Sequence, residues 1–185
     1  FMLGDHGRTG KHSVAVPRQD AWPLYEPCTH VPLLVHAPGQ KSARRCGELV
    51  HHADILPTLL DCAGIDPGPT AKGVSWKTIL EGGQLHTRDI AVTCSGLKPY
   101  GEKTANRVSI ASKQYSLILP TPSQPPELYN LALDPGQTLN LIRRQFDAAQ
   151  DLLGKFLELL DKLGCDPATI ESWKGSLDDP RDACA

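Results

Sequence analysis

Residues 108–119, Val-Ser-Ile-Ala-Ser-Lys-Gln-Tyr-Ser-Leu-Ile-Leu, decide how the second half of this chain folds. The segments 108–111 and 115–119 alternate with a period near two, and three polar residues, Ser112-Lys113-Gln114, separate them. This alternation is typical of strands with one buried face, and a short polar break between two such strands is typical of a tight turn. The stretch therefore predicts an antiparallel hairpin.

The residues downstream of this hairpin predict a loop, a short extended segment and a long helix. Residues 121–126 contain three prolines and cannot continue a strand, whereas Glu127–Leu131 reads as extended. Apolar residues then recur in alternating steps of four and three and form one helical stripe, which Gly164 ends. The stripe consists of Ile142, Phe146, Ala149, Leu153, Phe156, Leu160 and Leu163. It spans only three heptads, so we expect it to pack on the sheet. A further short helix is expected around residues 170–173, followed by a frayed tail.

The residues upstream of the hairpin predict an α/β unit. The apolar run at 31–35, Val-Pro-Leu-Leu-Val, fits a strand buried on both faces, as in a parallel sheet. Asp54 precedes apolar residues at helical spacing, and Gly64 offers the left-handed exit from that helix. We therefore expect a buried strand, a loop and an amphipathic helix capped by Asp54.

Composition excludes several classes of protein. The 185 residues carry a formal net charge of −2, which gives no sign of nucleic acid or an anionic membrane as a partner. No apolar run approaches the roughly 20 residues that a membrane span needs. The six cysteines lie far apart without a Cys-x-x-Cys pair, which argues against a zinc site. Isolated thiols are the favoured interpretation, and one or two disulfides remain open.

The first eleven residues, Phe-Met-Leu-Gly-Asp-His-Gly-Arg-Thr-Gly-Lys, place acid, imidazole and ammonium groups among three glycines. Glycine allows a close approach of backbone to ligand, and a lysine ammonium is a natural anchor for a tetrahedral oxyanion. Taken alone, the segment is equally compatible with a solvated glycine-rich turn. The abrupt start at Phe1 predicts a chain cut off on its upstream side, inside an active-site loop.

Three stretches, in order, resemble the sulfatase family of the alkaline-phosphatase superfamily. The first is Leu-Gly-Asp-His-Gly at 3–7 with Gly10-Lys11, followed by Leu-Tyr-Glu at 24–26 and the run at 29–35. The second is the helix region 53–65. The third combines Glu-Leu-Tyr-Asn-Leu at 127–131 with Asp-Pro-Gly-Gln-Thr at 134–138 and Asn140-Leu141. Together they cover most of residues 1–163.

The resemblance implies an α/β fold class, the C-terminal part of an alkaline-phosphatase-like sandwich. That fold has a mostly parallel sheet flanked by helices and a small antiparallel sheet packed by a C-terminal helix. We expect residues 1–85 to form the end of the catalytic α/β domain. Residues 86–164 would form a small α+β subdomain with the hairpin and the long helix, and residues 165–185 a tail.

Two registers are open for Asp5 and His6. They match either the family's metal-binding pair or its later Leu-Gly-Asp-His-Gly loop. The second register places Lys11 at the family's Gly-Lys without a gap, so we predict that one. Metal ligands are then expected upstream of Phe1, and Asp5 and His6 would be ligands only in the first register.

The resemblance implies hydrolysis of sulfuric esters by a formylglycine nucleophile, with Ca²⁺ held by carboxylates. None of the six cysteines lies in a Cys-x-Pro-x-Arg context. The resemblance implies that Lys11 is a catalytic residue that binds the sulfate. It also implies that His6 is a catalytic residue of the loop, with a non-catalytic loop residue as an equal alternative. His12 contacts the substrate or is simply exposed. We expect this chain alone to be inactive and to bind no calcium.

The remaining histidines receive structural interpretations. His51, His52 and Asp54 precede a helix, and we expect them to cap it rather than to bind a metal. His30 and His36 flank the apolar run, where hydrogen-bonded histidines are expected. Tyr25 and Glu26 are expected to shape the entrance to the site.

The expected partner is a sulfated small molecule or glycan, with no nucleic acid and no membrane. One alternative is a phosphodiesterase or phosphonate hydrolase of the same superfamily. Another is a non-catalytic remnant that binds a partner or a sulfated glycan. A secreted, periplasmic or lysosome-like compartment follows from the resemblance alone, and the substrate and the oligomeric state stay open.

Overall fold

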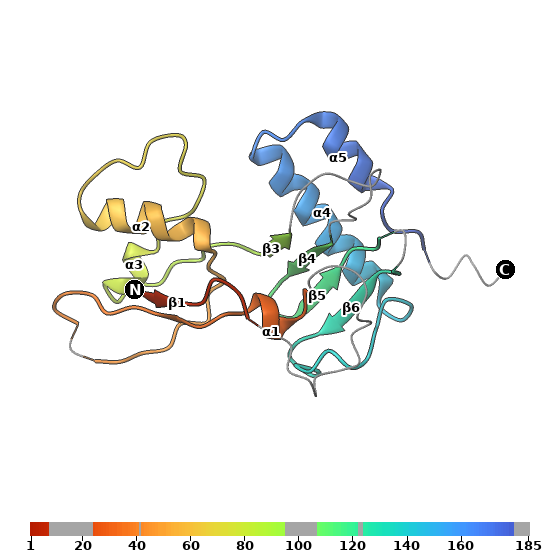
Figure 1. Ribbon diagram of the computed structural model, residues 1–185, viewed down its shortest axis with the longest axis horizontal. Helices are drawn as coiled ribbons and strands as arrows, with labels where there is room; N and C mark the ends of the chain where they lie inside the picture. Colours follow the sequence, from red (N-terminus) through yellow and green to blue (C-terminus); the bar gives the residue numbers. More distant parts are fainter. Residues whose placement is uncertain (8–23, 41, 95–106, 122–123, 180–185) are drawn as a thin grey trace.

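The computed structural model describes residues 1–7, 24–40, 42–94, 107–121 and 124–179, arranged as two neighbouring lobes (Figure 1). The chain is a mixed α/β protein, which confirms the predicted fold class. All strand pairs among the described residues are antiparallel, so these strands do not by themselves form the parallel sheet that the resemblance implies. In that part of the chain no helix is long and apolar enough to cross a membrane.

The C-terminal lobe is built on a four-stranded meander. Strands β3 (Ala91–Cys94), β4 (Val108–Ala111), β5 (Tyr115–Ile118) and β6 (Glu127–Asn130) lie in sequence order. The predicted hairpin is confirmed as β4 and β5, with Ser109 opposite Ile118. Its turn is held by the Ser112 hydroxyl oxygen, which accepts a hydrogen bond from the Tyr115 amide at 2.9 Å.

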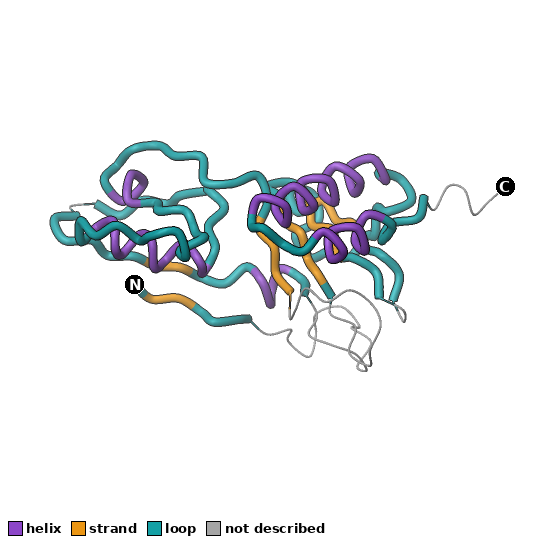
Figure 2. Tube along the Cα trace, turned by 90° about the horizontal axis from the view of Figure 1, so that it is seen from above, coloured by secondary structure: helices purple, strands orange, loops and turns teal. Residues whose placement is uncertain are grey.

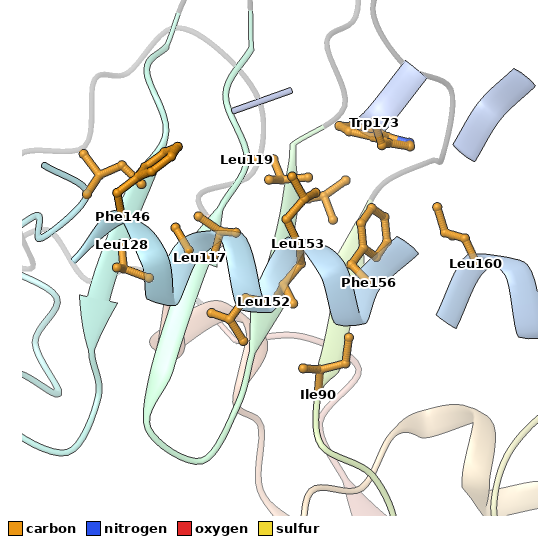
Figure 3. Packing of buried hydrophobic residues seen from close by; sticks show 14 residues of the cluster. Ile90, Leu117, Leu119, Leu128, Phe146, Leu152, Leu153, Phe156, Leu160 and Trp173 are labelled. Atoms are coloured by element: carbon orange, nitrogen blue, oxygen red, sulfur yellow. The ribbon is translucent and has the colours of Figure 1, made fainter. Parts of the chain in front are cut away.

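Two helices complete this lobe. Helix α4 (Phe146–Lys162) packs its apolar stripe on the sheet, and α5 (Pro167–Lys174) packs on α4. Figure 3 shows the side chains that meet between α4, α5 and the strands. The predicted stripe is confirmed from Phe146 to Leu160. Ile142 is buried as well but precedes the helix, and Leu163 at the other end is exposed. Gly164 has a φ of 75° and ends the helix as expected.

Helix α5 belongs to this core. Asp166 caps its first turn by accepting a hydrogen bond from the Thr169 amide at 3.1 Å. Trp173 is 1% exposed and meets Phe156 edge-on, with ring centroids 5.9 Å apart. The short helix expected around residues 170–173 is therefore present. It contributes a large apolar side chain to the core.

The N-terminal lobe differs from expectation at residues 31–35. Only Leu33–Leu34 forms a strand, β2, and it pairs antiparallel with β1 (Met2–Leu3). The prediction of a strand buried on both faces is wrong, since Leu34 is 54% exposed. Within the described residues β1 is the only strand that pairs with β2.

The predicted helix after Asp54 is confirmed as α2 (Ile55–Cys62), with Gly64 at a φ of 73°. It follows the short 3₁₀ turn η1 (His52–Asp54), and α3 (Lys77–Leu80) lies nearby. Its apolar stripe faces outward, since Leu56 is 58% and Leu59 44% exposed. Figure 2 shows both lobes from above, with α2 at the end of the molecule far from α4 and α5.

Candidate functional site

The structure describes the first part of the predicted sulfate-binding loop, up to Gly7. Lys11 and His12 lie outside the described residues, so their roles stay predictions. Residues 4–7 are described, together with the elements that hold them in place.

Asp5 and His6 form a local, solvent-exposed pair. Asp5 Oδ2 lies 3.7 Å from His6 Nε2, and the two side chains are 89% and 49% exposed. The His6 amide donates a hydrogen bond to Asp5 Oδ1 at 2.8 Å, and this bond, followed by the charge of His6, lowers the pKa of Asp5. His6 Nδ1 lies 2.9 Å from the Gly7 carbonyl oxygen, which can only accept, so Nδ1 carries a hydrogen. The other ring nitrogen, Nε2, is the one that faces the Asp5 carboxylate.

Within residues 1–7 the loop is anchored at Gly4 and at Gly7. The Gly4 amide donates to the Pro32 carbonyl at 3.2 Å, and His52 Nε2 donates to the Gly4 carbonyl at 2.9 Å. The Gly7 amide donates to the Cys28 carbonyl at 2.9 Å. A Cβ at Gly7 would lie 1.7 Å from the Pro27 carbonyl oxygen, so glycine is needed here for a close backbone approach.

The element that receives Gly7 is the short helix α1 (Glu26–Thr29). Its flanking residue Tyr25 donates through its hydroxyl to Glu127 Oε2 at 2.8 Å. The Glu26 amide donates to Gln137 Oε1 at 2.6 Å, and the Glu26 carboxylate contacts His30 Nδ1 at 2.7 Å. Tyr25 and Glu26 therefore tie α1 to the C-terminal lobe. Whether they also shape an entrance stays a prediction.

The Glu127 carboxylate accepts hydrogen bonds from three side chains in a partly buried cluster. Besides Tyr25, the Tyr129 hydroxyl donates to Oε2 at 2.8 Å and Arg107 Nη2 donates to Oε1 at 2.7 Å. Burial, followed by the Glu127 carboxylate, raises the pKa of both Tyr25 and Tyr129. Both phenols therefore keep their protons and donate at neutral pH.

Sequence reasoning missed Glu127, Gln137 and Arg107 as supports of the loop. Glu127 and Gln137 lie inside the third family-like stretch, but no local pattern indicates that they reach α1, more than 100 residues earlier. Two other polar residues of that stretch hold turns. Asn130 Oδ1 accepts from two amides that follow it, and Asp134 accepts from the amides of Thr138 and Leu139.

His51, His52 and Asp54 each make hydrogen bonds that join separate segments of the N-terminal half. His51 Nε2 lies 2.9 Å from the Val92 carbonyl oxygen, and His51 also caps η1. Asp54 departs from the prediction, because its side chain makes no capping bond to α2. It is wholly buried and accepts instead from the His51 amide, the Val74 amide and Arg88.

Calcium does not fit the described residues. In these ranges no three Asp, Glu, His or Cys side chains come together in a way that could hold a metal ion. Asp5 offers a single exposed carboxylate at the loop, whereas Ca²⁺ takes six to eight oxygen ligands. His36 is exposed, and His30 is occupied by Glu26.

Comparison with known proteins gives a consistent result. Residues 19–163 match the family described as N-sulphoglucosamine sulphohydrolase, C-terminal. Arylsulfatase K of Danio rerio is 28% identical over 132 residues, which cover 70% of this chain and 25% of the relative. Human N-acetylglucosamine-6-sulfatase is 39% identical over 84 residues, which cover 44% of this chain and 15% of the relative.

A solved structure supports the same conclusion. A putative sulfatase from Bacteroides thetaiotaomicron superposes with a TM-score of 0.64 at 25% identity, over 88% of this chain and 35% of that one. The chain spans about a quarter of the length of the arylsulfatase K that it matches. The matched family model covers most of the C-terminal lobe as well as α1 and α2. The chain belongs to the sulfatase family of the alkaline-phosphatase superfamily and corresponds to its C-terminal portion.

Proposed function

We propose that this chain is the C-terminal part of a sulfuric ester hydrolase, in which Lys11 binds the sulfate group of a sulfated small molecule or glycan. The family match over residues 19–163 carries this proposal. Two of the matching names, N-sulphoglucosamine sulphohydrolase and N-acetylglucosamine-6-sulfatase, refer to sulfated glucosamine, which supports an amino-sugar sulfate as substrate. The family match begins at residue 19, so the role of Lys11 rests on the Leu-Gly-Asp-His-Gly and Gly-Lys order before it.

The chemistry assigned to these residues is charge stabilisation. A sulfuryl group in transfer carries negative charge on its oxygens, and a cation already in position stabilises that charge without reorganisation. The Lys11 ammonium would bind one oxygen as a point charge. The role of His6 in this chemistry stays a prediction, and its Nε2 lies 3.7 Å from Asp5 Oδ2.

The nucleophile and the metal ligands have to come from other residues. No cysteine of this chain lies in a Cys-x-Pro-x-Arg context, and the described residues do not fit a calcium site. We therefore assign catalysis to a complete sulfatase that contains this chain, acting in a secreted, periplasmic or lysosome-like compartment.

The surface of the N-terminal lobe supports this assignment. Leu56 and Leu59 on α2, and Met2 and Leu34 on the two-stranded sheet, are between 44% and 65% exposed. Large apolar side chains left exposed on several elements of one lobe are typical of a surface that other structure covers. We propose that further strands and helices of the sulfatase α/β domain cover it.

The decisive experiment is Lys11→Ala in the complete sulfatase, assayed with an aryl sulfate. We expect kcat/KM to fall by about 10²–10³, the usual effect of removing one transition-state charge partner. The matched control is Lys72→Ala, which removes an exposed lysine of the same lobe and should leave turnover unchanged. Unchanged turnover in Lys11→Ala would disprove the role given to that lysine.

A second arm separates the alternatives. An aryl phosphate and a phosphonate monoester are assayed beside the sulfate ester. Faster turnover of either would replace the sulfatase by the phosphodiesterase or phosphonate hydrolase of the same superfamily. No turnover of any of them, together with retained binding of a sulfated glycan, would identify a non-catalytic remnant.

A further inference from the structure

The Glu127 carboxylate lies where the two lobes meet, at the first residue of β6. It accepts from Tyr25, which flanks α1, from Arg107, which precedes β4, and from Tyr129 of its own strand. The Arg107 side chain is 5% exposed and that of Glu127 15%. Hydrogen bonds to a charged acceptor in such a setting are stronger than those between neutral groups. In Figure 1, α1 lies beside β5 and β6, apart from α2 and α3.

A second contact joins the same two elements. Gln137 is 2% exposed, and its Oε1 accepts from the Glu26 amide at the start of α1. Gln137 has a φ of 52°, a left-handed conformation that costs free energy for a residue other than glycine. Its backbone is held there by the turn of Asp134, whose carbonyl accepts from the Gln137 amide at 3.0 Å. The tight turn after β6 thus aims Gln137 at α1.

The position of α1 in turn sets the position of the loop. Gly7 donates to the Cys28 carbonyl, and there is no space for even a Cβ between Gly7 and Pro27. A shift of α1 would therefore move Gly7 and the neighbouring His6. Direct contacts therefore connect Glu127 to Tyr25, and the helix α1 that follows Tyr25 to Gly7.

We propose that Glu127 is a positioning residue for the sulfate-binding loop. Through Tyr25 it holds α1 against the C-terminal sheet, and α1 holds the His6 end of the loop. The importance of this arrangement for catalysis rests on the proposed function, but the mechanical link does not.

Two tyrosines provide a matched pair of variants. Tyr25→Phe and Tyr129→Phe each remove one hydroxyl donor from the same oxygen, Glu127 Oε2. Tyr25 flanks α1, whereas Tyr129 belongs to the strand that carries Glu127. The two rings also meet edge-on, with centroids 6.0 Å apart, and phenylalanine keeps the ring in either variant. If Glu127 had a purely structural role, both variants would show the same hydrogen exchange at residues 4–7. If Glu127 positions the loop, exchange at residues 4–7 differs between the two variants.

The first measurement is hydrogen exchange of the Gly7 amide in the 185-residue chain. A lost hydrogen bond to a charged group corresponds to about 1.5 kcal/mol, so we expect roughly tenfold faster exchange in Tyr25→Phe. Exchange in Tyr129→Phe should stay close to the parent rate. Equal exchange in the two variants overturns the proposal. If Tyr25→Phe fails to fold, Gln137→Gly removes the other contact to α1 without backbone strain, and it should also accelerate exchange at Gly7.

The second measurement separates this inference from the proposed function. In the complete sulfatase we expect Tyr25→Phe to lower kcat/KM about tenfold for an aryl sulfate, with Tyr115→Phe on β5 as the neutral control. Faster Gly7 exchange without any effect of Lys11→Ala would retain the link and reject the sulfatase role of the loop. If Gly7 exchanges at the parent rate in both Tyr25→Phe and Gln137→Gly while Lys11→Ala strongly lowers turnover, the link from Glu127 to the loop is rejected and the sulfatase role of the loop is retained.

Discussion

The guanidinium of Arg88 binds the carboxylate of Asp54, which is wholly buried, across 34 residues of sequence. The same carboxylate accepts from the His51 amide at 2.7 Å and from the Val74 amide at 2.8 Å. One acid therefore joins the segment before α2, the segment before α3 and the segment before β3. Because this lobe buries few large apolar side chains, this hydrogen-bonded ion pair has a large share in holding it together.

We expect Asp54→Asn to destabilise the chain strongly. An asparagine of the same shape lacks the charge that Arg88 requires, and its amide nitrogen cannot accept from a backbone amide. Breaking a buried pair by removing one partner costs about 3–5 kcal/mol of the free energy of unfolding, measured by urea denaturation. The control is Asp61→Asn. The Asp61 side chain is 44% exposed and pairs with Lys77, so we expect its replacement to lower the free energy of unfolding by less than about 1 kcal/mol. Equal losses in the two variants would contradict this account.

Gly7→Ala tests the close approach of the loop to α1. The added methyl would lie 1.7 Å from the Pro27 carbonyl oxygen, a backbone atom that cannot move aside without α1. We expect faster hydrogen exchange across residues 4–7. We also expect a loss of about 1–3 kcal/mol in unfolding free energy, as for overpacking. Gly47→Ala meets nothing within 4 Å and should change neither quantity.

Trp173→Ala tests whether the residues after Gly164 are part of the folded core. The indole is 1% exposed against Phe156, and removing a buried aromatic side chain of this size costs about 3–5 kcal/mol. Leu133→Ala is the control, since Leu133 is 85% exposed and such surface changes stay within about 0.5 kcal/mol. Thermal unfolding followed by circular dichroism measures both. A melting temperature for Trp173→Ala equal to that of the parent would show that α5 does not stabilise the core.

Alkaline pH is expected to weaken the cluster around Glu127. Burial, followed by Glu127, raises the pKa of Tyr25 and Tyr129 above the ordinary value of 10.0. The folded state therefore keeps protons that the unfolded state releases, so this stability is complete below about pH 10 and is lost as the pH rises beyond it. Urea denaturation at about pH 9 and about pH 11 measures the loss. The double variant Tyr25→Phe with Tyr129→Phe should flatten the pH dependence, and an unchanged slope would contradict the assignment.

The predictions that the structure confirmed rest on local periodicity. The helical stripe from Phe146 to Leu160 and the hairpin at 108–119 bury the faces that their spacing indicates. The prediction for residues 31–35 failed because a run of apolar residues specifies no strand partner, and here β2 pairs only with β1 in the described ranges. The helix after Asp54 formed as predicted, yet Leu56 and Leu59 face outward. Periodicity identifies an apolar face but does not say whether the rest of this chain covers it.

The sequence by itself determined the family, the hairpin, the long helix and the glycine at its end, because each is encoded in the order of neighbouring residues. Only the tertiary structure decided what Asp54, Glu127 and Gln137 do. Each of these side chains is partly or wholly buried and must find hydrogen-bond partners, and its partners include residues 20 to more than 100 positions away. Which segments supply those partners depends on how the lobes pack. For this reason the sequence predicts a role for the loop carrying His6, whereas it gives no sign of the residues that support this loop.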